Sequence, residues 1–170
     1  MRILGIDPGI GRMGWGVIEM QSATLRQSLG REFKVQSCGC FETEPNSPTP
    51  GRLLKIYRFI SKLMDEYKPD ALSIEELFFN TNAKTAFVVG QSRGVVLLAA
   101  EEHGLQIGIY TPLQVKIAMT GYGRAEKRQV GQMVKTLLRL SVVPKPDDTT
   151  DALAIALTHA FSAKILNLKR

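Results

Sequence analysis

The sequence has few cysteines and no long apolar run. Its two cysteines, Cys38 and Cys40, are too few for a disulfide scaffold, and their spacing in an extended segment places both on one face rather than in a zinc site. The longest apolar run, residues 95–100, is far shorter than the roughly 20 residues of a membrane span. No signal peptide opens the chain, because Met1 leads directly into a strand pattern. We therefore expect a soluble cytoplasmic protein with no membrane contact.

What is present is the composition of an ordinary globular domain with an excess of positive charge. Apolar residues make up 44% and charged residues 22% of the 170 residues, which predicts one domain over residues 1–170. The 22 lysines and arginines exceed the 16 acidic residues, for a net charge of +6. The segment 112–145 holds seven basic residues against one acidic residue, and so accounts for the excess. A basic segment of this kind favours an anionic partner such as nucleic acid.

Alternation and turn signals predict an α/β domain with a five-stranded mixed sheet flanked by helices. Three strands should form an antiparallel meander, with a short link between the first two and a polar stretch before the third. Two later strands should be parallel because helices connect them. We expect the strands at residues 2–7, 14–20, about 33–43, 71–75 and 106–110. Helices are expected at about 50–67, 83–103, 112–119, 125–140 and 148–166, with the Thr49 hydroxyl capping the first of them.

Acidic residues lie at the ends of two of the expected core strands. Asp7 and Glu75 each follow an apolar strand, and the carboxyl ends of parallel strands are where sites form in α/β sheets. Asp148 and Asp151 are three residues apart at the start of a helix and so share a face. Each has an ordinary alternative: a turn for Asp7, a surface charge beside Glu76 for Glu75, and helix capping for the other two. Their joint occurrence favours a shared site.

Four carboxylates without histidine or cysteine suit hard cations such as Mg²⁺ or Mn²⁺. Like charges packed together would repel one another unless a metal neutralised them. Two such ions about 4 Å apart activate water and stabilise a leaving oxygen in phosphodiester hydrolysis. The acidic cluster and the basic segment together therefore indicate a nuclease.

Six motifs, in this order along nearly the whole chain, make the sequence similar to the RuvC family of bacterial Holliday junction resolvases. They are residues 3–9 with Gly14 and Gly16, Ile74-Glu75 with Phe78, residues 90–94, 114–116, 123–127 and 148–154. The resemblance implies a ribonuclease-H-like fold, a homodimer, and Mg²⁺-dependent paired nicking of four-way DNA junctions in recombination and repair. A longer connection at about residues 21–32 departs from the family pattern.

The family's functional residues carry over onto matching positions of this sequence. The resemblance places the catalytic, metal-binding acids at Asp7, Glu75, Asp148 and Asp151, and catalytic basic residues at Lys116 and Lys127. We expect two Mg²⁺ ions per subunit, with Mn²⁺ as a substitute and Asp7 bridging both. The products would carry a 5′ phosphate and a 3′ hydroxyl. A branch-migration motor of the RuvA and RuvB type is the implied partner, in the bacterial cytoplasm.

Further DNA contacts are expected outside the acidic cluster. Phe78 is predicted to stack on an unpaired base, although a phenylalanine is more commonly core. The remaining contacts are expected from Arg124, Lys127 and Arg128, each of which is otherwise an ordinary surface cation. Arg93, among apolar helix residues, is expected to be either a structural ion-pair partner or a DNA contact.

Three other functions stay open on the sequence alone. A sugar-kinase or actin-like ATPase shares the first strand and its Asp-x-Gly turn but needs two such lobes, and this chain has the length of one. A catalytically silent junction-binding module is disfavoured by the intact carboxylates. A ribonuclease-H-fold nuclease that acts on RNA is excluded less firmly.

Overall fold

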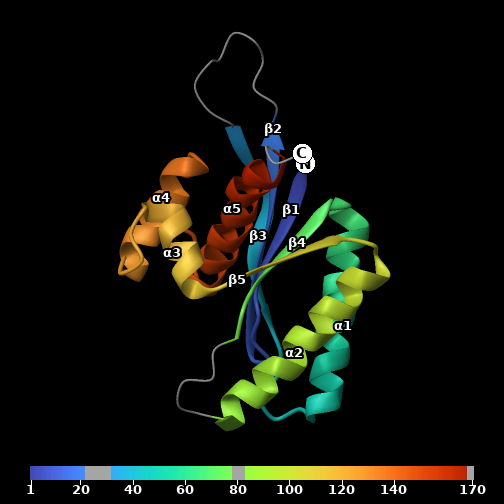
Figure 1. The fold of residues 1–170 in the computed structure, drawn as a ribbon. Coiled ribbons are helices and arrows are strands. Elements are labelled where there is room, and N and C mark those ends of the chain that lie inside the picture. The colour runs from blue at the N-terminus through green and yellow to red at the C-terminus, as the bar shows by residue number, and fades with distance from the viewer. Residues whose placement is uncertain (22–31, 78–82, 168–170) are drawn as a thin grey trace.

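The computed structural model describes residues 1–21, 32–77 and 83–167. Its sheet has five strands in the order β3-β2-β1-β4-β5 (Figure 1). β1 (Arg2–Asp7) pairs antiparallel with β2 (Arg12–Gln21), which pairs antiparallel with β3 (Glu32–Glu42). On its other side β1 is parallel to β4 (Ala71–Glu75), and β4 is parallel to β5 (Gln106–Tyr110). The predicted meander and parallel strands are confirmed.

Helices cover both faces of the sheet, and the side-chain alternation of β1 shows why. Leu4 and Ile6 are fully buried under α1 (Thr49–Tyr67) and α2 (Ala83–Glu102). Ile3 and Gly5 face the opposite way, toward α5 (Asp147–Asn167). α3 (Pro112–Thr120) and α4 (Lys127–Leu137) pack beside α5 on that face (Figure 1). The sheet is thus the middle of three layers.

Glycines let α5 lie directly on the sheet. A Cβ added to Gly5 would come within 2.1 Å of the Ala152 carbonyl oxygen, and one on Gly14 within 1.9 Å of the Asp148 carbonyl oxygen. A side chain at either position would therefore force the helix away. The close approach brings the first turn of α5 over the ends of β1 and β2.

Two helix starts and one helix end differ from the sequence prediction. The N-cap of α1 is Pro48 and no side chain caps it, so Thr49 is a helical residue rather than the cap. α5 begins at Asp147, which places Asp148 inside the helix. α4 is shorter than the predicted 125–140, because it ends at Leu137 and Arg139 adopts a left-handed φ of 51°. In the described ranges, no helix is long and apolar enough to cross a membrane.

Candidate active site

Asp7 and Glu75 are the last residues of two neighbouring parallel strands and lie at the same end of the sheet. The β1 and β4 ladder runs in register from Ile3 beside Ala71 to Ile6 beside Ile74, so the two acids come next on each strand. Ser73, two residues before Glu75, donates its hydroxyl to the Ile155 carbonyl of α5 at 2.8 Å. Because side chains alternate along a strand, Glu75 and Asp7 also face α5.

The first turn of α5 supplies Asp148 and Asp151. The Asp148 backbone lies against Gly14, which is the residue of β2 that pairs with Asp7. The structure therefore brings all four predicted acids to one end of the sheet. Asp147, one residue earlier, is half-exposed and pairs with Lys145 Nζ at 2.6 Å, as a solvated surface residue does.

Burial and crowding raise the pKa values of Asp7, Glu75 and Asp151. The pKa of Asp7 rises from 3.8 to about 7, first because it is buried and then because Glu75, Asp151 and Asp148 repel its charge. Burial and the charge of Asp151 raise the pKa of Glu75, and burial raises that of Asp151. The Lys127 cation opposes all three shifts. The positive charge of Lys127 is therefore too small to offset the burial and the mutual repulsion of these three acids.

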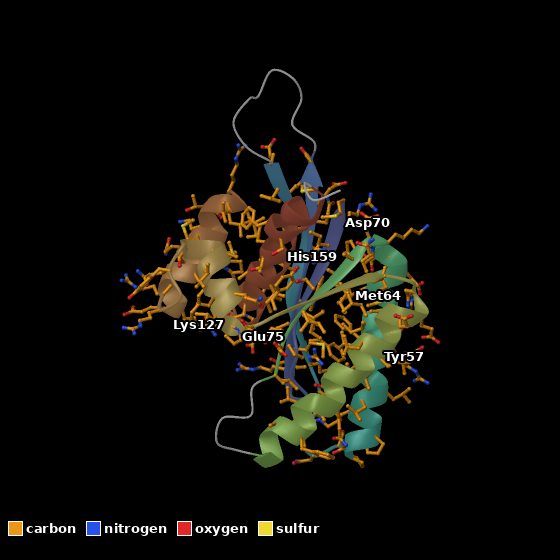
Figure 2. All side chains as sticks on the ribbon, in the orientation of Figure 1. Tyr57, Met64, Asp70, Glu75, Lys127 and His159 are labelled. Carbon is orange, nitrogen blue, oxygen red and sulfur yellow. The ribbon has the colours of Figure 1, made fainter. Side chains whose placement is uncertain are left out.

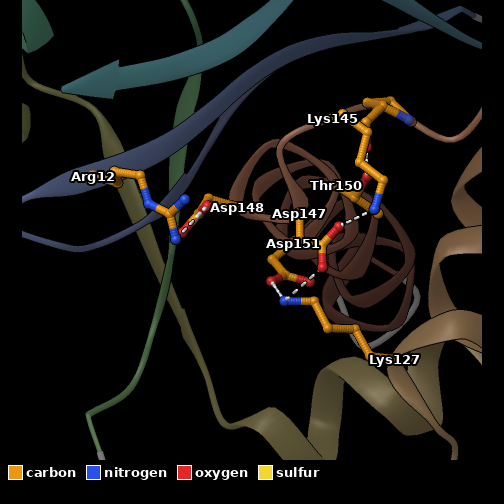
Figure 3. Close-up of polar contacts among 8 residues, drawn as sticks. Arg12, Lys127, Lys145, Asp147, Asp148, Thr150 and Asp151 are labelled. Carbon is orange, nitrogen blue, oxygen red and sulfur yellow. Dashed lines mark hydrogen bonds and ion pairs between the residues drawn. The ribbon is translucent and has the colours of Figure 1, made fainter.

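Besides Lys145, two further cations contact the acids of α5 (Figure 3). Lys127 Nζ lies 2.6 Å from an Asp151 carboxylate oxygen and 4.0 Å from one of Asp147. An Arg12 guanidinium nitrogen lies 3.6 Å from an Asp148 carboxylate oxygen. Although burial lowers the pKa of Lys127, its hydrogen bond to Asp151 and the surrounding carboxylates outweigh that effect and raise it. Lys127 therefore stays protonated at neutral pH.

Two adjoining pockets share Lys127 as a wall. The first, of about 300 Å³, is lined by Glu75, Asp151, Lys116 and Lys127, and Figure 2 shows Glu75 and Lys127 beside each other. The second, of about 310 Å³, is lined by Lys127 and a further set that includes Arg128, Lys145 and Asp147. The first pocket is thus lined by both acidic and basic side chains, whereas the charged side chains of the second pocket are mainly basic.

The comparisons with known proteins decide the family. A sequence profile described as crossover junction endodeoxyribonuclease RuvC matches residues 3–159. The chain belongs to the RuvC family. The crossover junction endodeoxyribonuclease RuvC of Alkaliphilus oremlandii is 50% identical over 168 residues, which are 99% of this chain and 98% of that protein. The RuvC of Brevibacillus brevis is 53% identical over 160 residues, 94% of this chain and 92% of its own.

Solved structures agree with the RuvC fold. The Thermus thermophilus RuvC structure is 36% identical with a TM-score of 0.88, and covers 97% of this chain and 96% of that one. The same protein in complex with a Holliday junction substrate is 34% identical with a TM-score of 0.86 over the same shares. The yeast mitochondrial Holliday junction resolvase Ydc2, at 15% identity, has a TM-score of 0.65 over 97% of this chain and 80% of its own, and shares the fold. The predicted ribonuclease-H-like sheet is confirmed.

Not every predicted residue reaches the RuvC pockets. Glu75, Asp151, Lys116, Lys127 and Arg128 line them, whereas Asp7, Asp148 and Arg124 line neither. Arg124 is exposed in the connection between α3 and α4. Phe78 and the 21–32 connection, apart from its two end residues, lie outside the described residues. Arg12 and Lys145 were not predicted from the sequence. The charge excess over 112–145 was a signal for Lys145, but nothing in the sequence indicated that Arg12 lies beside Asp148.

The donor set of this RuvC site fits a hard divalent cation. All four donors are carboxylates, and a divalent ion would offset the burial and the like charges that raise the pKa values of Asp7, Glu75 and Asp151. Among the residues the structure describes, no three acidic, histidine or cysteine side chains converge on one point as they stand. Lys127 on Asp151 and Arg12 on Asp148 hold two of the donors instead. Metal binding therefore competes with these two ion pairs.

Proposed function

We propose that the protein is a structure-selective endonuclease that resolves four-way DNA junctions by metal-dependent phosphodiester hydrolysis. The observation that carries this is the gathering of four carboxylates from β1, β4 and α5 at one end of the sheet, where Glu75 and Asp151 line a pocket with Lys116 and Lys127. A relative in complex with a Holliday junction substrate, with a TM-score of 0.86 over 97% of this chain, supports the junction as substrate.

Asp7, Glu75, Asp148 and Asp151 would hold the divalent metal, which we propose is Mg²⁺ at two ions per subunit, with Mn²⁺ as a substitute. When bound, the ions supply an activated water and stabilise the leaving 3′ oxygen. Asp7 has the central position, since the charges of the three other acids all act on it, and we assign it to both ions. The expected products carry a 5′ phosphate and a 3′ hydroxyl.

The lysines act as fixed positive charges. Because Lys127 stays protonated, it does not accept a proton from water; it attracts a phosphate and limits the repulsion among the acids. Lys116 lines the same pocket from α3 and can contact the same phosphate. Arg128 and Lys145 extend the positive surface into the second pocket, where they can contact further phosphates of the same DNA strand.

We further propose a homodimer in which each subunit cuts one of two opposed strands. α2 supports this because it exposes apolar side chains along one stripe: Phe87 is 67% exposed and Leu98 is 63% exposed, with Gly94 between them. Burying this stripe against a second copy would pair two active sites, as symmetric nicks require. A motor of the RuvA and RuvB type is the expected further partner, in the bacterial cytoplasm.

The decisive experiment compares substrates and metal. A synthetic four-way junction, the matching linear duplex and a structured RNA are each incubated with the protein, with Mg²⁺ and with chelator. We expect paired nicks in the junction with Mg²⁺ only, and junction binding without nicking for Asp7→Asn. Equal cutting of junction and duplex would remove the structure selectivity, and preferential cutting of RNA would change the substrate class.

A further inference from the structure

Arg93 of α2 contacts the backbone of Glu75. Its Nε donates a hydrogen bond to the Glu75 carbonyl oxygen at 3.2 Å. The contact joins a helix on one face of the sheet to the strand end that carries a carboxylate of the proposed site. The carbonyl of a strand residue ordinarily accepts a hydrogen bond from a backbone N–H of the neighbouring strand. A side-chain donor at Glu75 indicates that the neighbouring strand does not supply one.

The direction of the Glu75 carbonyl follows from its neighbour. Glu76 donates its backbone N–H to the Tyr110 carbonyl of β5 at 2.8 Å. The peptide bond between Glu75 and Glu76 is trans, so the C=O and the N–H of this peptide point in opposite directions. The Glu75 carbonyl therefore points away from β5, toward the side of β4 on which β1 lies.

On that side β1 has no donor to offer. In a parallel ladder, the carbonyl of a residue accepts from the N–H of the residue that follows its partner on the neighbouring strand. Continuing the register from Ile6 beside Ile74 makes Asp7 the partner of Glu75 and Pro8 the residue that follows. Proline has no backbone N–H, so the ladder bond to the Glu75 carbonyl cannot form.

We propose that Arg93 is a positioning residue for Glu75, because it supplies the hydrogen bond that Pro8 cannot. The side chain fixes the end of β4, and so holds the Glu75 carboxylate beside Asp7, where both face α5. This inference rests on the proposed function of Glu75 as a metal ligand. Partners that orient metal ligands in this way typically change metal affinity or activity roughly 10- to 100-fold when they are removed.

The test replaces Arg93 by methionine, which keeps an unbranched side chain of similar reach but has no donor. We expect kcat for junction nicking to fall roughly 10- to 100-fold, and the Mg²⁺ concentration for half-maximal activity to rise. Junction affinity in chelator, and its salt dependence, should stay as in the parent. Arg58→Met is the matched control, since Arg58 is exposed on α1 and loses the same charge.

A second pair of variants tests the reason given for the contact. Pro8→Ala introduces a backbone N–H at the position where the ladder lacks one. We expect Arg93→Met to cost less in kcat on the Pro8→Ala background than on the parent background. The Glu76 amide should exchange its hydrogen faster in Arg93→Met, and the added Pro8→Ala change should slow it again. This exchange is measured without metal or DNA.

The outcomes separate this inference from the proposed function. Unchanged kcat and Glu76 exchange in Arg93→Met would overturn the positioning role, while the parent still cuts junctions. A lower junction affinity with a salt slope reduced by about one and normal kcat would instead make Arg93 a phosphate contact. If Arg93→Met does not fold, Arg93→Lys is used, and its loss of kcat with intact affinity is the result expected. If the parent protein cuts no junction, the proposed function is wrong. The exchange of the Glu76 amide would still show whether Arg93 fixes the end of β4.

Discussion

At the residue scale, Asp7 is defined by the charges around it. It lies partly buried at the end of β1, and its pKa of about 7 means that the metal-free site holds a proton at this position near neutral pH. A divalent cation would displace this proton, so metal binding should release protons and weaken as the pH falls. Lys127 and Arg12 reduce the repulsion only in part, because each contacts an acid of α5.

The raised pKa of Asp7 makes the metal-free protein less stable as the pH rises. Between the unfolded value of 3.8 and the folded value of about 7, the native state binds more protons than the unfolded chain. The free energy of unfolding therefore falls through this window. Asp7→Asn removes the effect, so the variant should be more stable than the parent at pH 8, by on the order of 1 to 4 kcal/mol.

The measurement is chemical denaturation in chelator from pH 4 to pH 8. The advantage of Asp7→Asn should shrink toward pH 4, where Asp7 is protonated in the parent. Glu101→Gln, an exposed position on α2, serves as the control and should show no such trend. If Asp7→Asn exceeded the parent in free energy of unfolding by the same amount at every pH, the raised pKa of Asp7 would be contradicted.

At the scale of the elements, the site depends on how closely α5 approaches the sheet. Gly5 and Gly14 allow helix backbone to contact strand backbone, and this contact sets where Asp148 and Asp151 lie. The acids of α5 are therefore placed by main-chain packing.

Gly14→Ala should damage both stability and activity. The added Cβ would lie 1.9 Å from the Asp148 carbonyl oxygen, so the first turn of α5 must move. We expect a loss of about 1 to 3 kcal/mol of stability and a larger relative loss of nicking than of junction binding. Gly51→Ala is the matched control, because a Cβ there meets no atom within 4 Å and alanine favours the helix. If Gly14→Ala kept full nicking activity, the exact position of α5 would not be required for catalysis.

The sequence predicts the elements correctly where the signal is local. Strand alternation and turn residues located β1 and β4, and their endings located Asp7 and Glu75. Prediction failed where contacts depend on which side chains meet across elements: the Arg93 contact requires the position of α2, and the Arg12 contact requires the position of α5. Thr49 was wrong as a cap because Pro50 fits at either of the first two helical positions, so the sequence does not say whether the helix begins at Thr49 or after it.

At the scale of the whole molecule, charge and apolar surface lie on different sides of the sheet. The basic residues of the two pockets belong to α3, α4 and the approach to α5, whereas the exposed apolar stripe lies on α2. One side is therefore suited to DNA and the other to a second subunit (Figure 1).

The basic side should dominate junction affinity. We expect Lys127→Gln with Arg128→Gln to weaken binding in chelator and to reduce the slope of log affinity against log salt, by about 0.9 for each phosphate that the protein no longer neutralises. Lys55→Gln with Lys62→Gln removes the same charge from α1 and should have a smaller effect. Equal effects of the two pairs, measured by titration at several salt concentrations, would show that only net charge matters.

The apolar stripe should decide the oligomeric state. Phe87→Asp with Leu98→Asp places charges in the proposed interface, and we expect a monomer in sedimentation analysis that no longer makes paired nicks. Leu54→Asp, on the exposed side of α1 at 48% exposure, is the control and should stay dimeric. A double variant that remains dimeric would place the interface elsewhere.

The four acids come from three distant parts of the chain, since Asp7 closes β1, Glu75 closes β4, and Asp148 and Asp151 lie near the start of α5. During synthesis on a ribosome, the chain has made both sheet acids long before it has made α5. Until that helix emerges and settles on Gly5 and Gly14, half of the acids are missing. A nascent chain that has not yet made α5 therefore lacks two of the four proposed metal ligands, and we expect it to cut no DNA.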